Sequence, residues 1–134
     1  MVISGGEPFI HQNLPELCRA LIDIGKDVGI ETSGSFWQSV PEEVFITLSP
    51  KFHISPNYPV LDVFWKRANE FKLVISKGGE LDCYLDKLQD FDGFLYLQPE
   101  YDDFKNSIQK TLSLLKTYND FKLSLQIHKI LNIQ

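Results

Sequence analysis

Short apolar runs alternate along this chain with segments whose apolar residues recur at helical spacing. The apolar runs are residues 2–3, 28–31, 44–48, 71–75, 94–97 and 121–125. This order is typical of a parallel sheet in which crossover helices join successive strands. We therefore predict an α/β fold with a mostly parallel sheet, formed as a single domain over residues 1–134.

The first predicted helix has clear signals at both ends. Its apolar residues recur at i, i+3, i+4, i+7 and i+8: Leu14, Leu17, Cys18, Leu21 and Ile22. Asn13 is a suitable N-cap, Pro15 falls in the first turn, and Glu16 occupies the capping-box position. Gly25 is a natural stop.

Two further helices are predicted, and one stretch is left without an element. A short helix passes through Leu81, Leu85 and Leu88. A longer helix places Phe104, Ile108, Leu112 and Leu115 on one face. The stretch 52–69 contains Pro56 and Pro59, and its first half receives no predicted element.

Composition excludes some classes of partner. The net charge is −5, and lysines and arginines are scattered singly. Because no basic field would attract phosphates, we expect no nucleic-acid partner and no membrane surface. No apolar run is long enough to span a bilayer and no signal peptide is recognised, so we expect a cytoplasmic protein. Cys18 and Cys83 are expected to be reduced core thiols, which cannot form a metal site by themselves.

Several predicted strands end in small or polar residues. The sequences at these ends are SGGEP, ETSG, SPK and QPE. In parallel α/β proteins, ligands bind beyond the carboxyl ends of the strands. Any one of these segments is explained as an ordinary turn, but together they favour a single ligand site built from separate segments.

The motifs resemble a known family. Ser4-Gly5-Gly6-Glu7-Pro8 resembles the GGEP motif of radical S-adenosylmethionine (SAM) enzymes, in which glycines let the backbone approach the ligand. The succession ETSG, LSPK, KLVI, LQPE and LSLQIHKILNIQ resembles the 7-carboxy-7-deazaguanine synthases of that superfamily over the whole chain. The resemblance implies a partial radical SAM β/α barrel.

The resemblance also implies ligand contacts by position. The SAM-contacting positions would be Gly5, Gly6, Glu7, Ser49, Pro50, Lys51, Gln98, Pro99, Glu100 and Tyr101. The Glu7 carboxylate could pair with the ammonium group of SAM. Ser4 and the terminal carboxylate of Gln134 would contact the substrate, 6-carboxy-5,6,7,8-tetrahydropterin.

The resemblance implies cofactors whose ligands this sequence lacks. Such enzymes hold a [4Fe–4S] cluster on a C-x3-C-x2-C loop and also use Mg²⁺, and both sites precede GGEP in the family. We therefore expect a C-terminal portion of a synthase, inactive alone and dependent on an N-terminal half. No residue of this chain is assigned as catalytic or as a metal ligand. Intact family members are commonly homodimers.

Several residues near these motifs have ordinary structural explanations. Glu31 is expected to support the site from beneath, and we assign it no catalytic role. His11 and His53 have no partner at metal-ligand spacing, and His128 and Lys129 are explained as the surface of a final turn.

Three alternative functions remain open at this stage. One is a non-catalytic remnant or a fragment that binds SAM or a pterin without chemistry. A second is another radical SAM protein of the activase type, against which the HKILNIQ ending argues. The third is a generic nucleotide-binding α/β domain, which ranks last because the chain has no glycine-rich phosphate loop of either common spacing.

Overall fold

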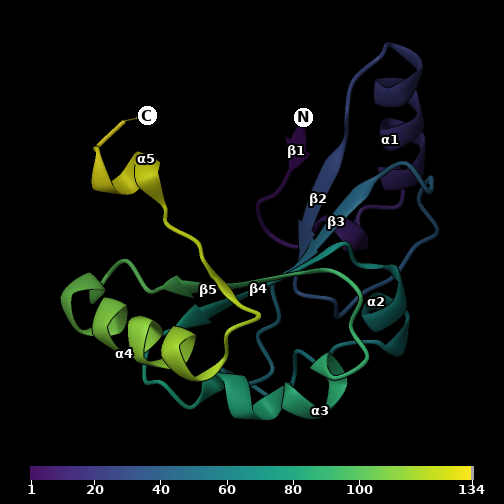
Figure 1. The fold of residues 1–134 in the computed structure, drawn as a ribbon. Helices are drawn as coiled ribbons and strands as arrows, with labels where there is room; N and C mark the ends of the chain where they lie inside the picture. The colour runs from purple at the N-terminus through teal and green to yellow at the C-terminus, as the bar shows by residue number, and fades with distance from the viewer. Residues whose placement is uncertain (134) are drawn as a thin grey trace.

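The computed structural model describes residues 1–133 and contains one six-stranded sheet (Figure 1). All neighbouring strands run parallel, and their spatial order follows the chain from β1 to β6. The strands are β1 (Val2–Ile3), β2 (Gly29–Thr32), β3 (Phe45–Leu48), β4 (Glu70–Ile75), β5 (Phe94–Pro99) and β6 (Lys122–Leu123).

Helices cover one side of this sheet. The α-helices are α1 (Leu14–Asp23), α2 (Asp62–Arg67), α3 (Leu85–Leu88), α4 (Phe104–Thr117) and α5 (Ile127–Ile130). Two 3₁₀ segments, η1 (Pro8–Ile10) and η2 (Glu80–Cys83), lie in the connections. Figure 1 shows α1 to α4 along one side of the curved sheet, while α5 lies apart on the other side.

The two faces of the sheet differ in burial. In β4, Phe71, Leu73 and Ile75 are fully buried, whereas the alternate residues are only partly buried. The buried set packs against the helices in one continuous core. The other face, here called the open face, is formed by residues that the strand registers align: Val2, Gly29, Glu31, Phe45, Thr47, Glu70, Lys72, Val74, Phe94, Tyr96, Gln98 and Lys122.

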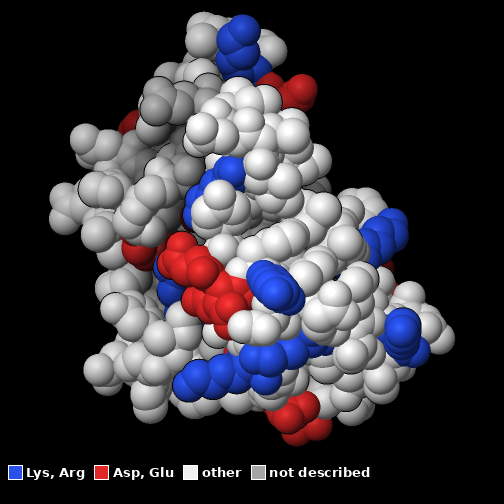
Figure 2. Space-filling view, turned by 90° about the vertical axis from the view of Figure 1, so that its left-hand side faces the viewer, with Lys and Arg blue, Asp and Glu red and all other residues white. Residues whose placement is uncertain are grey.

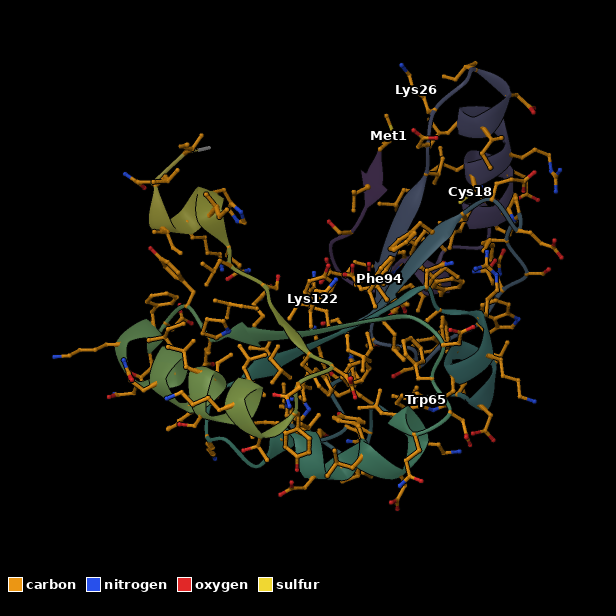
Figure 3. All side chains as sticks on the ribbon, viewed as in Figure 1. Met1, Cys18, Lys26, Trp65, Phe94 and Lys122 are labelled. Carbon is orange, nitrogen blue, oxygen red and sulfur yellow. The ribbon has the colours of Figure 1, made fainter. Side chains whose placement is uncertain are left out.

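The open face leaves apolar groups accessible. Phe94 is 54% exposed, and the Lys122 ammonium lies 5.7 Å from the centre of its ring (Figure 3). Val2 is 71% exposed on β1, which among residues 1–133 pairs with β2 alone. The predicted α/β class with a mostly parallel sheet is confirmed, and the curved, open sheet has the form of a partial barrel.

The first helix ends as predicted but begins without the predicted side-chain cap. The backbone N–H groups of Gly25 and Lys26 donate to the carbonyls of Ile22 and Leu21, which is a Schellman ending. Asn13 occupies the N-cap position, yet its side chain makes no capping hydrogen bond within residues 1–133. The helix is held instead by its buried face, to which Cys18 belongs (Figure 3).

Two predictions about side-chain placement were wrong. In α4 the most buried residues are Ser107 and Thr111, while Leu112 is 39% exposed. The hydroxyls of Ser107 and Thr111 donate to the carbonyls of Glu100 and Ser107 at 2.7 and 2.8 Å, so these small residues can face the sheet. Cys83 is exposed on η2 rather than buried in the core.

The segment 52–69 contains one element that no strong periodic pattern indicated. Helix α2 is only six residues long, and Phe64 is its single fully buried anchor. The Arg67 guanidinium at its end donates to the carbonyls of Pro41, Glu42 and Val44, which fixes the loop before β3. Tertiary contacts of this kind, rather than local propensity, define the helix.

Charges of both signs are mixed on the surface. On the face shown in Figure 2, acidic and basic side chains lie next to one another, without an extended basic area. Among residues 1–133, no helix combines the length and the apolarity needed to cross a membrane.

Candidate functional site

The carboxyl ends of the first three strands enclose a cavity of about 300 Å³, here called the β1–β3 cavity. It is lined by polar residues and glycines from all three strand ends: Ser4, Gly5, Gly6, Glu31, Thr32, Ser33, Ser49 and Lys51. The parallel arrangement places these segments together because every strand end points to the same edge. Five of the sequence-predicted residues therefore lie in one cavity: Ser4, Gly5, Gly6, Ser49 and Lys51.

Two consecutive glycines form the turn after β1. Gly5 has φ of 89° and Gly6 has φ of 56°, both in the left-handed region that other residues adopt only with strain. A Cβ atom built on either glycine would meet no described atom within 4 Å. The glycines are therefore required by backbone conformation rather than by crowding, and open space remains above them for a ligand.

Glu7 connects this turn to the end of β2. Its Oε1 atom accepts from Thr32 Oγ1 at 2.7 Å and from the Phe9 N–H at 3.2 Å. Its Oε2 atom accepts from the N–H and the hydroxyl of Ser33, at 2.8 and 2.5 Å. A carboxylate has about four acceptor positions, and all four are used within the protein. Glu7 thus fixes the glycine turn against β2.

Glu31, which we expected to support the site from beneath, lies in the lining of the β1–β3 cavity. Its Oε1 atom is 3.0 Å from the ammonium nitrogen of Lys72 on β4. The side chain of Lys72 is only 17% exposed and that of Glu31 is 37% exposed. The cavity therefore contains a carboxylate held by a largely buried cation.

Two further cavities continue along the same edge. One of about 490 Å³ lies at the ends of β4 and β5, with lining residues His53, Ile54, Val74, Ser76, Lys77, Gly79, Glu80, Cys83 and Glu100. The other, of about 200 Å³, here called the tail cavity, is lined by Val74, Gln98, Glu100, Tyr101, Asp102, Gln126 and Lys129. A separate hollow of about 660 Å³ near Arg19 and residues 39–43 lies before β3, away from these strand ends.

The C-terminal segment forms one wall of the tail cavity through Gln126 and Lys129. The Tyr101 hydroxyl donates to the Lys129 carbonyl at 3.1 Å, and the Lys129 ammonium lies 5.2 Å from the centre of the Tyr101 ring. Gln98 is only 7% exposed beneath this segment. The Tyr101–Lys129 contact links α5 to the end of β5, although Ile127 and Leu131 remain about 60% exposed.

Glu80 stabilises the loop that follows β4. Burial alone would raise the pKa of its carboxyl, but hydrogen bonds from backbone N–H groups, including those of Lys77, Gly78 and Ser76, lower it below its ordinary value. The loop therefore carries a fixed negative charge at neutral pH. Its N–H groups are occupied by this internal carboxylate and are not offered to a phosphate.

His53 lines the neighbouring cavity at the ends of β4 and β5. Burial lowers the pKa of its imidazole, and the charge of Glu80 opposes this effect only in part. The Nδ1 atom of His53 is 2.9 Å from the Tyr84 hydroxyl, so the ring is fixed by a neutral partner.

The cysteines of the chain do not suit an iron–sulfur cluster. The sequence contains two cysteines, whereas such clusters require at least three thiolate ligands from the protein when one iron is left open. Cys18 is buried in α1, where burial raises the pKa of its thiol, and Cys83 is exposed on η2. Within residues 1–133, no three His, Cys, Asp or Glu side chains are grouped as a metal site would require.

The remaining predicted residues are distributed as follows. Gln98, Glu100 and Tyr101 line the tail cavity, and Pro99 ends β5. Pro50 is buried next to the β1–β3 cavity without lining it. Gln134 lies outside the described residues.

Sequence reasoning missed several lining residues. Glu31, Thr32 and Ser33 belong to the ETSG segment, whose polar ending was the available signal. Gln126 and Lys129 line the tail cavity, and they belong to the terminal QIHK block.

Comparison with known proteins gives consistent matches. A 7-carboxy-7-deazaguanine synthase of Aquifex aeolicus is 34% identical over 147 residues, covering 100% of this chain and 65% of that protein. The synthase of Escherichia coli K12 is 34% identical over 140 residues, covering 99% of this chain and 60% of that protein. No protein-family model matches the chain.

A solved structure matches as well. The crystal structure of QueE from Escherichia coli aligns with a TM-score of 0.77 at 29% identity, covering 93% of this chain and 55% of that one. The fold thus defines an α/β protein with a partial parallel barrel and cavities at the carboxyl ends of its strands. The chain is a homologue of the 7-carboxy-7-deazaguanine synthases and spans about 60–65% of the length of the curated relatives it matches.

Proposed function

We propose that this chain supplies SAM- and substrate-binding segments of a 7-carboxy-7-deazaguanine synthase in queuosine biosynthesis. The complete enzyme would be a radical SAM lyase that converts 6-carboxy-5,6,7,8-tetrahydropterin to 7-carboxy-7-deazaguanine with loss of ammonia. The observation that carries this proposal is the β1–β3 cavity, where the Gly5-Gly6 turn lies beside Ser49 and Lys51. The names of the homologues agree with it.

SAM would lie along the carboxyl edge of the sheet. The open space above Gly5 and Gly6 fits its amino acid moiety, because backbone groups can approach where no Cβ intervenes. Lys51 would provide a cation for the carboxylate of that moiety. Glu7 would contribute by fixing the turn through its hydrogen bonds to β2. The other contacts would come from the segments Ser49–Lys51 and Gln98–Tyr101.

In this enzyme class, SAM that is reduced by a [4Fe–4S] cluster supplies the group that abstracts hydrogen from the substrate. The two cysteines of this chain cannot hold such a cluster. What the chain's residues do is bind and orient SAM and the pterin. The cluster and Mg²⁺ ligands would come from a further portion of the enzyme.

The exposed edge of β1 is where we propose that this further portion docks. In the described part of the chain β1 pairs on one side only, and a parallel strand added beside it would continue the sheet. The chain would then correspond to the C-terminal portion of the synthase, and the assembled enzyme would be cytoplasmic and homodimeric.

The substrate would occupy the part of the β1–β3 cavity nearest the open face. Ser4 lines that cavity and would offer its hydroxyl to the pterin. The terminal carboxylate of Gln134 would provide a further contact.

A second candidate is a fragment that binds SAM or a pterin without chemistry. The specific observation in its favour is that the chain combines a formed cavity with only two cysteines. The two candidates share a binding site and differ in whether the chain joins a cluster-bearing partner.

Calorimetry with SAM, followed by a turnover assay, tests the proposal. The chain should bind SAM, and after cluster reconstitution it should form no deoxyadenosine unless the missing portion is supplied. QueE from Escherichia coli serves as the positive control. Turnover by the isolated chain would contradict the proposal that a further portion must supply the cluster. Absence of SAM binding would contradict the assignment of the site. If the missing portion restores no turnover to a chain that binds SAM, the second candidate is favoured.

A further inference from the structure

The ion pair between Glu31 and Lys72 joins two strands that are not neighbours. Glu31 is on β2 and Lys72 on β4, with β3 between them. Both side chains emerge on the open face, and the pair reaches across β3 with an N–O distance of 3.0 Å. Glu31 also lines the β1–β3 cavity, whereas Lys72 does not.

The environment of this pair differs from that of the other ion pair within residues 1–133. Lys87 and Asp62 are 2.9 Å apart, but their side chains are 56% and 85% exposed. The side chain of Lys72 is only 17% exposed, and that of Glu31 is 37% exposed. An ion pair with one largely buried and one partly exposed partner contributes little net stability. Its presence beside a cavity therefore points to orientation of a ligand-binding group.

The geometry leaves one oxygen of Glu31 available. Oε1 contacts Lys72, and within the described part of the chain no hydrogen bond engages Oε2. A carboxylate held at one oxygen by a cation presents the other in a defined direction. N–H groups of a ligand in the cavity, such as those of the 2-amino-4-oxopyrimidine ring of a reduced pterin, are suitable donors.

We infer that Lys72 is a positioning residue, which fixes the Glu31 carboxylate toward the β1–β3 cavity and so determines the affinity for the pterin. This inference rests on the proposed function, because it takes the ligand of that cavity to be the pterin. Lys72 acts through Glu31 and touches no ligand itself. Replacement of Lys72 should therefore leave the pterin affinity unchanged in a chain whose Glu31 carboxylate has already been removed.

Fluorescence titration with 6-carboxypterin, a stable oxidised analogue of the substrate, tests the inference on the full chain. K72M should weaken binding roughly tenfold, the loss expected when a charge-assisted hydrogen bond no longer fixes the carboxylate. E31Q should weaken it at least as much, and the double variant K72M/E31Q should bind like E31Q alone. K72R should retain most of the affinity, since arginine keeps the cation.

K87M is the matched control, because it breaks the exposed ion pair far from the cavity. It should leave pterin affinity unchanged. SAM binding, measured in parallel on K72M, K72R and K87M, whose substituted residues do not line the cavity, should also remain within about twofold of the wild type, which shows that these variants are folded.

The outcomes separate this inference from the proposed function. Unchanged pterin affinity in K72M, or losses in K72M and E31Q that simply add, would overturn the positioning role while the proposed function stands. A wild-type chain that binds SAM but no pterin would overturn the inference and the substrate assignment together. A wild-type chain that binds pterin but no SAM would contradict the proposed function without affecting the role of Lys72.

Discussion

Ser33 donates its backbone N–H to Glu7 Oε2 at 2.8 Å and thereby ties the turn after β1 to the end of β2. The contact spans 26 residues of sequence and joins two of the polar strand ends. Because the same carboxylate also accepts from Thr32 and Phe9, the glycine turn is held in place before any ligand arrives. Preorganisation of this kind reduces the ordering that a ligand must impose.

Replacement of Glu7 by glutamine should both destabilise the chain and weaken SAM binding. In either orientation the amide NH₂ would face a backbone N–H, that of Ser33 or that of Phe9, and leave it without an acceptor at a cost of about 1–3 kcal/mol. Urea denaturation measures the stability, and calorimetry measures the affinity for SAM. E43Q, at an exposed residue of the loop before β3, is the control and should change neither. Wild-type behaviour of E7Q in both assays would show that the hydrogen bonds do not fix the turn.

Replacement of Gly6 by alanine should lower both the free energy of unfolding and the affinity for SAM. The loss of affinity should exceed what the loss of stability alone would cause. The φ of 56° should cost alanine roughly 1–2 kcal/mol. In addition, the new Cβ would occupy the open space above the turn, so we expect SAM binding to fall by at least about tenfold.

Gly25 provides a matched control for that variant. Its φ is 75° and no described atom lies within 4 Å of a built Cβ, but it sits at the end of α1. G25A should therefore lose similar stability and keep its affinity for SAM. Equal SAM affinities in G6A and G25A would argue against a ligand above the turn.

The pKa of Glu80 predicts how one part of the stability depends on pH. Because its folded-state pKa lies below the ordinary value of 4.5, the ionised carboxylate favours folding. Its contribution is fully present above the unfolded-state pKa and is lost as the pH falls through the lower folded-state pKa. E80Q should be less stable than the wild type by about 1–3 kcal/mol at pH 7, and this difference should narrow below about pH 4.5.

Urea denaturation of both proteins between pH 3 and pH 7 measures this difference. A gap between wild type and E80Q that stays constant over the whole range would show that the charge of Glu80 does not stabilise the loop.

Replacement of Tyr101 by phenylalanine should loosen the C-terminal segment. The hydrogen bond to the Lys129 carbonyl would be lost, while the aromatic ring would remain. Amide hydrogen exchange across residues 125–131 should accelerate, since α5 has few other contacts that protect it. K129M keeps the carbonyl acceptor and should have a smaller effect. Exchange equal to that of the wild type would show that other contacts hold α5.

The arrangement of strands was predictable from the sequence because short apolar runs and polar strand ends recur in order. The gathering of Ser4, Gly5, Gly6, Ser49 and Lys51 in one cavity followed from the parallel topology alone. Parallel strands share one carboxyl edge, so residues that follow different strands meet there.

Other features depended on tertiary contacts that a linear pattern does not reveal. The buried face of α4 passes through Ser107, whose hydroxyl is satisfied by a carbonyl, so polarity did not predict exposure. The Glu31–Lys72 pair could not be predicted from the sequence, because its two residues meet only through the register of β2, β3 and β4. Helix α2 is held by Phe64 and Arg67 in a segment without a strong periodic signal.

The most direct test of the account is the position of SAM on the chain, mapped by ¹H–¹⁵N NMR during a titration. The account predicts that amide shifts change at Ser4, Gly5, Gly6, Ser49 and Lys51, with further changes near Glu100 and Tyr101. Changes confined to the hollow near Arg19 and residues 39–43, or no changes at about 1 mM SAM, would contradict it.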